Sequence, residues 1–309
     1  MLKYVLKRLL LMIPTLLGVI FIVFTVMNIT PSDPGRAILG TVATQEQVDQ
    51  LNHELGYDQP FLKRFLDYCV DLLQGDMGTS YRTRTPFTTE LLGRLPTTLR
   101  LGAVSFVISS ILGIALGILS AVKQYSFADV FCSTTAILFA SIPGFFLGMV
   151  LIHVFALRMG LFPTFGGADW NSLVLPIITL TLSSTVTVQR LTRTTMLEAI
   201  RQDYIRTAKA KGCSNARITW KHALKNAILP VITVMGINAG TAMGGAVVCE
   251  TVFSLPGMGT YILNAIQSKD IPVVMSSTVV LSLIFCVVML LVDVLYAIID
   301  PRIRERVTR

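Results

Sequence analysis

The chain has 309 residues, of which 53% are hydrophobic and only 14% are charged. A soluble domain usually carries about 25% charged residues, so this composition excludes an ordinary soluble protein. The formal net charge is +8. We attribute this positive charge to the basic residues of loops on one side of a membrane, and not to binding of nucleic acid.

Six apolar runs are long enough to cross a membrane, since a span needs about 20 mostly apolar residues. They predict six transmembrane helices in an all-α integral membrane protein. No run shows the period-two alternation that is typical of barrel strands. In chain order the runs are Leu9–Ser32, Leu101–Val122, Val130–Leu157, Asn171–Gln189, Asn226–Cys249 and Ile271–Val292.

The start of the chain allows two interpretations. Lys3, Lys7 and Arg8 precede the first apolar run, as basic residues do in a signal peptide. The run is 24 residues long and no small-residue cleavage site follows it, whereas a signal peptide has an apolar core of about 7–15 residues. We therefore expect residues 1–32 to hold a basic segment and a retained first helix.

Residues 33–93 predict an extracytoplasmic segment with two or three short amphipathic helices. Thr44 and Gln47 have the spacing of a capping box, so a helix begins there and ends near Gly56. A second helix is expected over Phe61–Gln74 and ends at the glycine that follows. Such helices lie on the membrane surface or pack on the rim of a helical bundle. Contact with an external partner is the alternative.

The basic residues indicate the orientation of the chain. If the N-terminus is cytoplasmic, 17 of the 26 Lys and Arg residues fall in cytoplasmic segments and two in short outer loops. The other seven lie in the long first outer segment, where the charge rule barely applies. We therefore expect both termini in the cytoplasm, and the Pro- and Gly-containing turns at 162–167 and 255–259 outside.

Residues 193–226 form the main cytoplasmic loop in this topology. They carry eight basic and two acidic residues, and each charge costs about 2.5–3.5 kcal/mol at the centre of a span. The spacing of apolar and small residues over 196–211 nevertheless predicts a helix. Gly212 breaks that helix, and a second short helix is expected over 218–224. Binding to anionic lipid headgroups is the simplest interpretation of this loop.

The fifth apolar run contains a stretch of small residues, Asn238–Ala246. Small residues let helix backbones approach closely, and they also leave room beside a pathway. Close packing is the simpler interpretation. If the stretch lines a pathway, the candidate residues are Asn238, Thr241 and Gly245.

The cytoplasmic loop resembles the EAA loop of the permease subunits of ATP-binding-cassette importers. The resemblance is carried by Arg206-Thr-Ala208, three further residues and Gly212, followed later by Ile228-Leu-Pro230. In this chain Arg206 and Thr207 stand where that family often has Glu and Ala. The sequence pattern of this loop contains more than a lipid anchor requires, because an anchor needs neither a fixed glycine nor an alternation of Ala with Lys.

Further motifs resemble the oligopeptide, dipeptide and nickel branch of that family. They run from end to end of the chain in a fixed order. The long first outer segment makes the chain similar to the first (B-type) of the two permease subunits. The motifs are Ser32-Asp-Pro34, Leu55-Gly-Tyr-Asp-Gln-Pro60, Gly75-Asp-Met-Gly-Thr-Ser80, Glu250-Thr-Val-Phe-Ser-Leu-Pro-Gly-Met-Gly259 and Asp300-Pro-Arg302.

The resemblance implies a type I importer permease fold in a bacterial or archaeal cytoplasmic membrane. It implies a permease domain at 94–297 that holds five of the helices, and a basic tail at 298–309. The subunit is expected to form half of a pathway for dipeptides or oligopeptides, with nickel chelates, opines or glutathione as alternative cargoes. The implied partners are a second permease, two ATPase subunits and an extracytoplasmic binding protein, besides membrane lipid.

The resemblance also implies that the loop docks on a cytoplasmic ATPase. The residues expected to make or support that contact share the loop 193–226. They are Glu198, Asp203, Tyr204, Arg206, Thr207, Ala208, Ala210, Lys211, Gly212 and Asn215.

Several kinds of chemistry are not expected of this chain. It has no G-x-x-x-x-G-K-[ST] loop to cradle phosphates, so we expect a non-catalytic subunit without a cofactor. His53 is expected in the outer segment, His153 within a span and His222 on the cytoplasmic side, so the three do not form a metal site. The five cysteines include no C-x-x-C and are expected to stay unpaired.

Two other functional classes remain as alternatives. An ion-coupled secondary transporter would need ionisable groups within its spans, and the candidates are His153, Glu250 and Asp293. Such a transporter would also show repeated halves with broken helices, and no convincing repeat is present. A membrane scaffold without transport would need neither the small-residue stretch nor the corner at Gly212.

Overall fold

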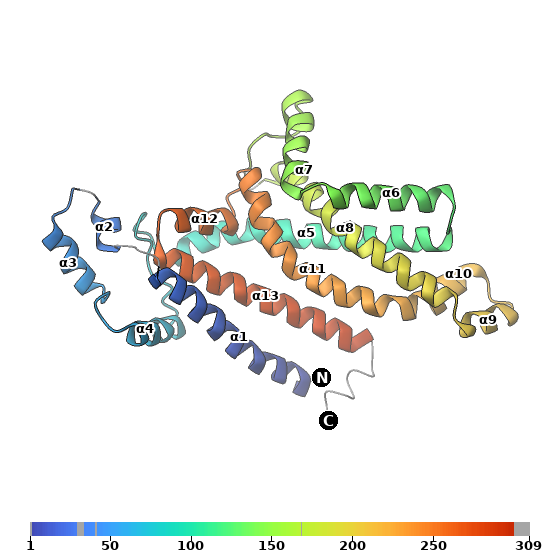
Figure 1. Ribbon diagram of the computed structural model, residues 1–309, viewed down its shortest axis with the longest axis horizontal. Coiled ribbons are helices and arrows are strands. Elements are labelled where there is room, and N and C mark those ends of the chain that lie inside the picture. Colours follow the sequence, from blue (N-terminus) through green and yellow to red (C-terminus); the bar gives the residue numbers. More distant parts are fainter. Residues whose placement is uncertain (1, 30–33, 41, 168, 300–309) are drawn as a thin grey trace. The chain divides into compact units, whose positions relative to one another are not determined.

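The computed structural model describes residues 2–29, 34–40, 42–167 and 169–299. Within these ranges the side chains of residues 2–4, 37, 241–243, 245 and 295–299 are not described. The regular structure of the described residues is helical apart from one isolated β-bridge between Thr79 and Pro86 (Figure 1). The sequence-based expectation of an all-α protein is thus confirmed for this part of the chain.

The chain divides into two compact units. Unit 1 holds Thr98–Leu255 together with the two chain ends, and unit 2 holds Lys7–Thr97 and Pro256–Cys286. The chain passes between them four times: within α1 (Leu2–Ile29), within α5 (Phe87–Val122), between Leu255 and Pro256, and within α13 (Ile271–Ile299). α5 also runs through position 93/94, where the sequence suggested a domain boundary.

Among the described residues, five helices are long and apolar enough to cross a membrane. Four of them are α1 (Leu2–Ile29), α5, α8 (Trp170–Ile200) and α13. The fifth is Asn215–Gly240, which consists of two short helical segments over residues 215–223 and the first part of α11 (Leu224–Val252). A sixth span exists if a bent pair counts as one: α6 (Phe127–Ser141) with α7 (Gly144–Leu151) and its π-helical continuation η1 (Ile152–Arg158). Each predicted run overlaps one of these six, and residues 30–32 at the end of the first run lie outside the described residues.

The third predicted span is not a straight helix. Its two halves are bent by 99° at the break between α6 and α7, and Figure 1 shows the steep angle. Pro143 explains the break, because the ring of a proline pushes the preceding residue out of the helical region. Ile142 accordingly has φ −90° and ψ 120°. The apolar character of the run concealed this bend, although Pro143 and Gly144 within it were a sequence signal for a break.

Unit 1 is a bundle in which α8 and α11 lie side by side and α5 and α6 pack against α8 (Figure 1). Glycine permits the closest of these contacts. A Cβ atom added at Gly117 of α5 would lie 2.5 Å from Cβ of Thr192 and 2.8 Å from the carbonyl oxygen of Gln189 on α8. Small residues at such a crossing let two membrane helices approach until their backbones nearly touch.

Gly117→Ala is expected to destabilise the subunit by about 1–3 kcal/mol, because α5 and α8 must separate to admit the methyl group. The matched control is Gly18→Ala in α1, where an added Cβ meets nothing within 4 Å. We expect that change to be neutral or slightly stabilising, since alanine favours a helix. Thermal unfolding of the purified complex measures both. Equal effects of the two changes would contradict the close α5–α8 contact.

Unit 2 confirms the two short helices expected in the outer segment. α3 (Gln45–Glu54) begins at the predicted capping box. The Thr44 hydroxyl accepts from the Gln47 N–H at 3.4 Å, and the Gln47 side chain accepts from the Thr44 N–H at 3.0 Å. α4 (Phe61–Leu73) ends before Gly75, whose φ is +86°. A third short helix, α2 (Pro34–Leu39), precedes them.

One helix of unit 2 contradicts a sequence-based expectation. The turn expected at 255–259 ends early, because α12 (Met258–Gln267) begins inside it. Met258, Tyr261 and Ala265 are buried at helical spacing, so the signal was present beyond the Pro-Gly pair. The turn-forming residues dominated the sequence pattern and concealed the start of the helix.

The loop between α4 and α5 is fixed to the start of α13 by a buried carboxylate. Asp270 accepts from the Ser80 hydroxyl at 2.5 Å and from the backbone N–H groups of Tyr81 and Arg82 at 3.1 and 3.4 Å. The Ser276 hydroxyl also donates to the carbonyl of Met77. These bonds stabilise the loop in a position that could not be predicted from the sequence.

Candidate functional site

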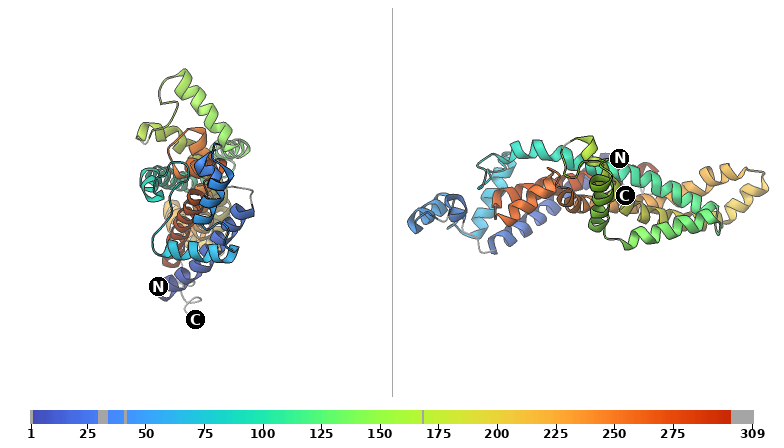
Figure 2. Two further views of the ribbon diagram at one scale, coloured as in Figure 1. Left: turned by 90° about the vertical axis from the view of Figure 1, so that its left-hand side faces the viewer. Right: turned by 90° about the horizontal axis from the view of Figure 1, so that it is seen from above.

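The predicted cytoplasmic loop forms one tip of unit 1. α8 ends at Ile200, α9 (Asp203–Ala210) follows, and α10 (Asn215–Arg217) with the π-helical η2 (Ile218–Ala223) leads directly into α11. Figures 1 and 2 show α9 and α10 at this end, beyond the neighbouring ends of α5 and α6. The loop is therefore placed as an exposed corner between the two main helices of the unit.

Two expectations about helices in this loop were wrong. The helix expected over 196–211 is interrupted at Arg201 and Gln202, and Gln202 has an extended ψ of 154°. The apolar residues of α8 and α9 keep a helical spacing across this break because both sets pack into the same core. The helix expected over 218–224 is not separate, since it continues into α11.

The corner at Gly212 was predicted correctly. Gly212 has φ +77°, a conformation that costs an L-residue with a side chain about 1–2 kcal/mol. The Cys213 N–H reaches back to the Ala208 carbonyl at 3.1 Å, which satisfies the end of α9 in the manner of a Schellman motif. Ser214 then caps α10 by accepting from the Arg217 N–H at 3.4 Å.

α9 has one buried face and one exposed face. Ile205 and Ala208 are buried in a core with Met196 and Ala199 of α8, Ile118 of α5 and residues that lead into α11. The other positions of α9 are exposed. The inner face therefore fixes α9 to the ends of three long helices, and the outer face is free to contact another molecule.

The structure places the ten residues of the predicted contact as follows. Ala208 points into the core and supports the loop from within. The other nine are exposed at the tip: Glu198, Asp203, Tyr204, Arg206, Thr207, Ala210, Lys211, Gly212 and Asn215. The only ion pair found among them is Arg206 with Asp203, at 3.4 Å and highly exposed, and such pairs contribute little to stability.

An ion pair with a buried carboxylate and a partly exposed arginine lies close to the base of the loop, and the sequence analysis missed it. Arg193 of α8 donates to both carboxylate oxygens of Asp129 at 2.8 and 2.9 Å. The Asp129 side chain is 5% exposed, and it also accepts from the Ser120 hydroxyl and the Tyr125 N–H. The pair joins α8 to the α5–α6 turn. Ser126 caps α6 by accepting from the Asp129 N–H, which marks the start of that helix but gives no sequence signal for the pair with Arg193.

The predicted pathway residues lie on α11. Asn238 is half-buried there. The side chain of Thr241 and the surroundings of Gly245 lie outside what the structure describes. Near the end of the same helix, the buried Glu250 accepts from the Thr98 hydroxyl at 2.6 Å. His153 is exposed in η1 and Asp293 is half-buried in α13.

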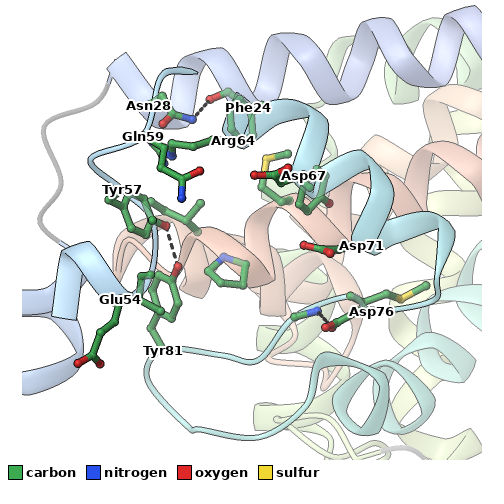
Figure 3. A pocket seen from close by; sticks show the side chains of 18 residues that line it. Phe24, Asn28, Glu54, Tyr57, Gln59, Arg64, Asp67, Asp71, Asp76 and Tyr81 are labelled. Carbon is green, nitrogen blue, oxygen red and sulfur yellow. Dashed lines mark hydrogen bonds between the residues drawn. The ribbon is translucent and has the colours of Figure 1, made fainter. Parts of the chain in front are cut away.

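Unit 2 contains a polar cavity of about 370 Å³ that the sequence analysis did not anticipate. Arg64 lies over the ring of Tyr57 at 4.2 Å, and the hydroxyls of Tyr57 and Tyr81 are 2.7 Å apart (Figure 3). Asp67 and Asp71 reach the cavity from α4. Among the described residues, no group of three His, Cys, Asp or Glu side chains is arranged to hold a metal ion.

Fold and site together define a multi-pass helical membrane protein with a rigidly supported, basic, exposed corner on one end of a bundle. Residues 113–305 match the family described as the binding-protein-dependent transport system inner membrane component. Residues 1–102 match the N-terminal region described for such membrane components. The chain belongs to this family: it is a permease subunit of a binding-protein-dependent ATP-binding-cassette importer.

Curated relatives match along the whole chain. The glutathione transport system permease protein GsiC of Escherichia coli K12 is 40% identical over 306 residues, which cover 99% of this chain and 100% of the relative. GsiC of Salmonella typhimurium LT2 matches at the same identity and coverage. The similarity therefore includes the outer segment as well as the permease helices.

Solved structures share the fold at lower identity. A subunit of the inward-facing MetNI methionine ABC transporter superposes with a TM-score of 0.58 at 20% identity, covering 68% of this chain and 96% of that chain. A chain of an amino acid ABC transporter with histidines gives 0.53 at 15% identity, covering 70% and 95%. These likenesses show a type I importer permease fold.

Proposed function

We propose that this permease subunit imports short peptides, with glutathione, itself a short peptide, as the candidate that the curated relatives favour. The single observation that supports this cargo class is the 40% identity to glutathione permeases over the full length. The sequence motifs point to the same branch of importers. The compound that co-purifies with the partner binding protein tests the proposal. A nickel chelate or an opine in that position would contradict it.

We propose further that the exposed face of α9 and the corner at Gly212 dock on a cytoplasmic ATPase subunit, which hydrolyses ATP for the complex. The nine exposed residues of the loop form the candidate contact surface. The buried Ile205 and Ala208 tie this surface to the ends of α5, α8 and α11. A displacement of the corner would therefore move membrane helices as well. A second permease subunit, a second ATPase and an extracytoplasmic binding protein complete the proposed complex.

The proposed topology places both termini in the cytoplasm, residues 33–93 outside, the permease domain at 94–297 and the basic tail at 298–309. It rests on the distribution of Lys and Arg. With the native cysteines removed, Gln50→Cys is expected to react with an impermeant thiol reagent added outside, and Ala216→Cys only after the membrane is opened. Both positions are exposed. Labelling of position 216 but not of position 50 from outside would reverse the topology.

We propose that Asn238, Thr241 and Gly245 border the translocation pathway on α11. Asn238 and Thr241 are three residues apart and so share one helix face. Thr241→Trp is expected to abolish uptake, because an indole fills the space beside a stretch of small residues, while the complex still assembles. The matched control is Thr251→Trp, at an exposed position beyond that stretch. Full uptake by the Thr241→Trp complex would contradict the proposal that this face of α11 borders the pathway.

A further inference from the structure

α4 has three distinct faces, and one of them is apolar and uncovered. Phe61, Phe65 and Tyr68 pack on the rings of Phe21 and Phe24 of α1, with ring centroids 5.2–6.2 Å apart. The polar face carries Arg64, Asp67 and Asp71, which line the cavity of unit 2 (Figure 3). The third face is exposed and consists of Leu62, Leu66, Val70 and Leu73.

The exposed face is a continuous stripe. Leu62, Leu66, Val70 and Leu73 follow one another at steps of four, four and three residues, so they line up along one side of the helix. Their exposed fractions are 62%, 54%, 50% and 87%. A stripe of this kind on a helix of only 13 residues marks contact with another apolar phase or partner.

The depth of α4 identifies the apolar phase. The segment Val5–Ile29 of α1 is long and apolar enough to cross a bilayer. Phe24 and Phe21 lie five and eight steps before Ile29, or about 7.5 and 12 Å along the helix. α4 packs at this level. An interfacial helix buries its apolar face about 5–10 Å below the headgroup boundary.

The stripe is also continuous with an exposed apolar surface of α1. Phe21 is 44% exposed on α1 and contacts both Phe61 and Phe65 of α4. Ile22 and Val26, on the same part of α1, are 62% and 56% exposed. Lys63 is exposed and borders the stripe on its polar side, where a long basic side chain can reach phosphate groups.

We propose that α4 is an interfacial anchor whose stripe of Leu62, Leu66, Val70 and Leu73 is embedded among phospholipid acyl chains at the edge of the bilayer. The cavity beside Asp67 and Asp71 then faces the aqueous side. The anchor fixes the height of the outer segment above the spans. It rests on α1 being a membrane span, which the length and apolar composition of Val5–Ile29 support, and not on which side of the membrane α4 occupies.

Spin labels at single cysteines test this placement in the complete importer complex, reconstituted in vesicles of phosphatidylethanolamine and phosphatidylglycerol. The five native cysteines are first removed. Leu66→Cys and Leu62→Cys report the stripe, Ile22→Cys is the lipid-facing reference on α1, and Asp71→Cys is the control on the polar face of α4. Collisions with oxygen report lipid, and collisions with a water-soluble nickel chelate report water.

Labels at positions 62 and 66 are expected to collide more with oxygen than with the chelate, as at position 22, and the label at 71 is expected to show the reverse. A stripe that is more accessible to the chelate lies in water and overturns the proposal. A stripe shielded from both reagents is covered by a protein partner, which overturns it equally. The sidedness of the chain does not enter these ratios, so an error in the proposed topology would leave them unchanged.

Discussion

Replacing Arg193 by alanine is expected to destabilise the permease by about 3 kcal/mol, because it leaves the Asp129 carboxylate buried without its cation. Asp129 is 5% exposed on its side chain and receives two hydrogen bonds from the guanidinium. The bonds that remain, from Ser120 and Tyr125, hold the cost at the lower end of the usual range of about 3–5 kcal/mol. Thermal unfolding of the purified complex should move to a lower temperature.

Two controls separate the ion pair from a loss of side-chain bulk. Arg190→Ala removes an exposed arginine from the same helix and should change stability by less than about 0.5 kcal/mol. The double variant Arg193→Ala with Asp129→Ala removes both charges and should recover part of the loss. Additive effects of the two single changes would contradict a direct coupling between the residues.

Gly212→Val is expected to uncouple ATP hydrolysis from transport. Gly212 has φ +77° and an added Cβ would meet nothing within 4 Å, so the cost comes from the backbone rather than from a clash within this chain. A β-branched residue resists that conformation by about 1–2 kcal/mol, and 1.4 kcal/mol corresponds to about a tenfold change in an equilibrium. We expect stimulation of the ATPase by loaded binding protein, and uptake, to fall roughly tenfold while all subunits co-purify.

The chain offers matched controls for this variant. Gly212→Asn should retain most of the stimulation, because asparagine tolerates a positive φ better than other side chains do. Gly75→Val imposes the same type of strain at φ +86°, also in open space, but in the outer segment. It should leave the coupling intact. Normal ATPase stimulation and uptake in the Gly212→Val complex would contradict docking of the loop on the ATPase and would favour binding of the loop to lipid headgroups.

The sequence was most informative about the spans and the local signals at helix ends. Six uncharged runs predicted the six apolar segments, and the capping box at Thr44 predicted the start of α3. Both signals are local, because bilayer thickness sets the length of a span and a cap involves residues three apart. The corner at Gly212 was accessible for the same reason, since few residues other than glycine adopt that backbone conformation.

The features that the sequence could not provide depend on residues far apart in the chain. Asp129 and Arg193 are 64 residues apart, and Asp270 bonds to Ser80 across 190 residues. No periodicity links such pairs. The break at Arg201 and Gln202 was hidden because the apolar residues on its two sides reach the same core. The apolar stripe on α4 was visible as helical spacing, but which part of that face packs on α1 required the three-dimensional contacts.

ATP-dependent uptake into vesicles tests the central claim most directly, namely that this chain is the membrane subunit of an ATP-driven importer that needs a binding protein. The complete complex is reconstituted with ATP on the side of the ATPase subunits, and a labelled short peptide and its binding protein on the other. Our account predicts uptake that requires both ATP and the binding protein and that stops when this subunit is omitted. Uptake driven by an ion gradient without ATP, or uptake that persists without this subunit, would contradict it.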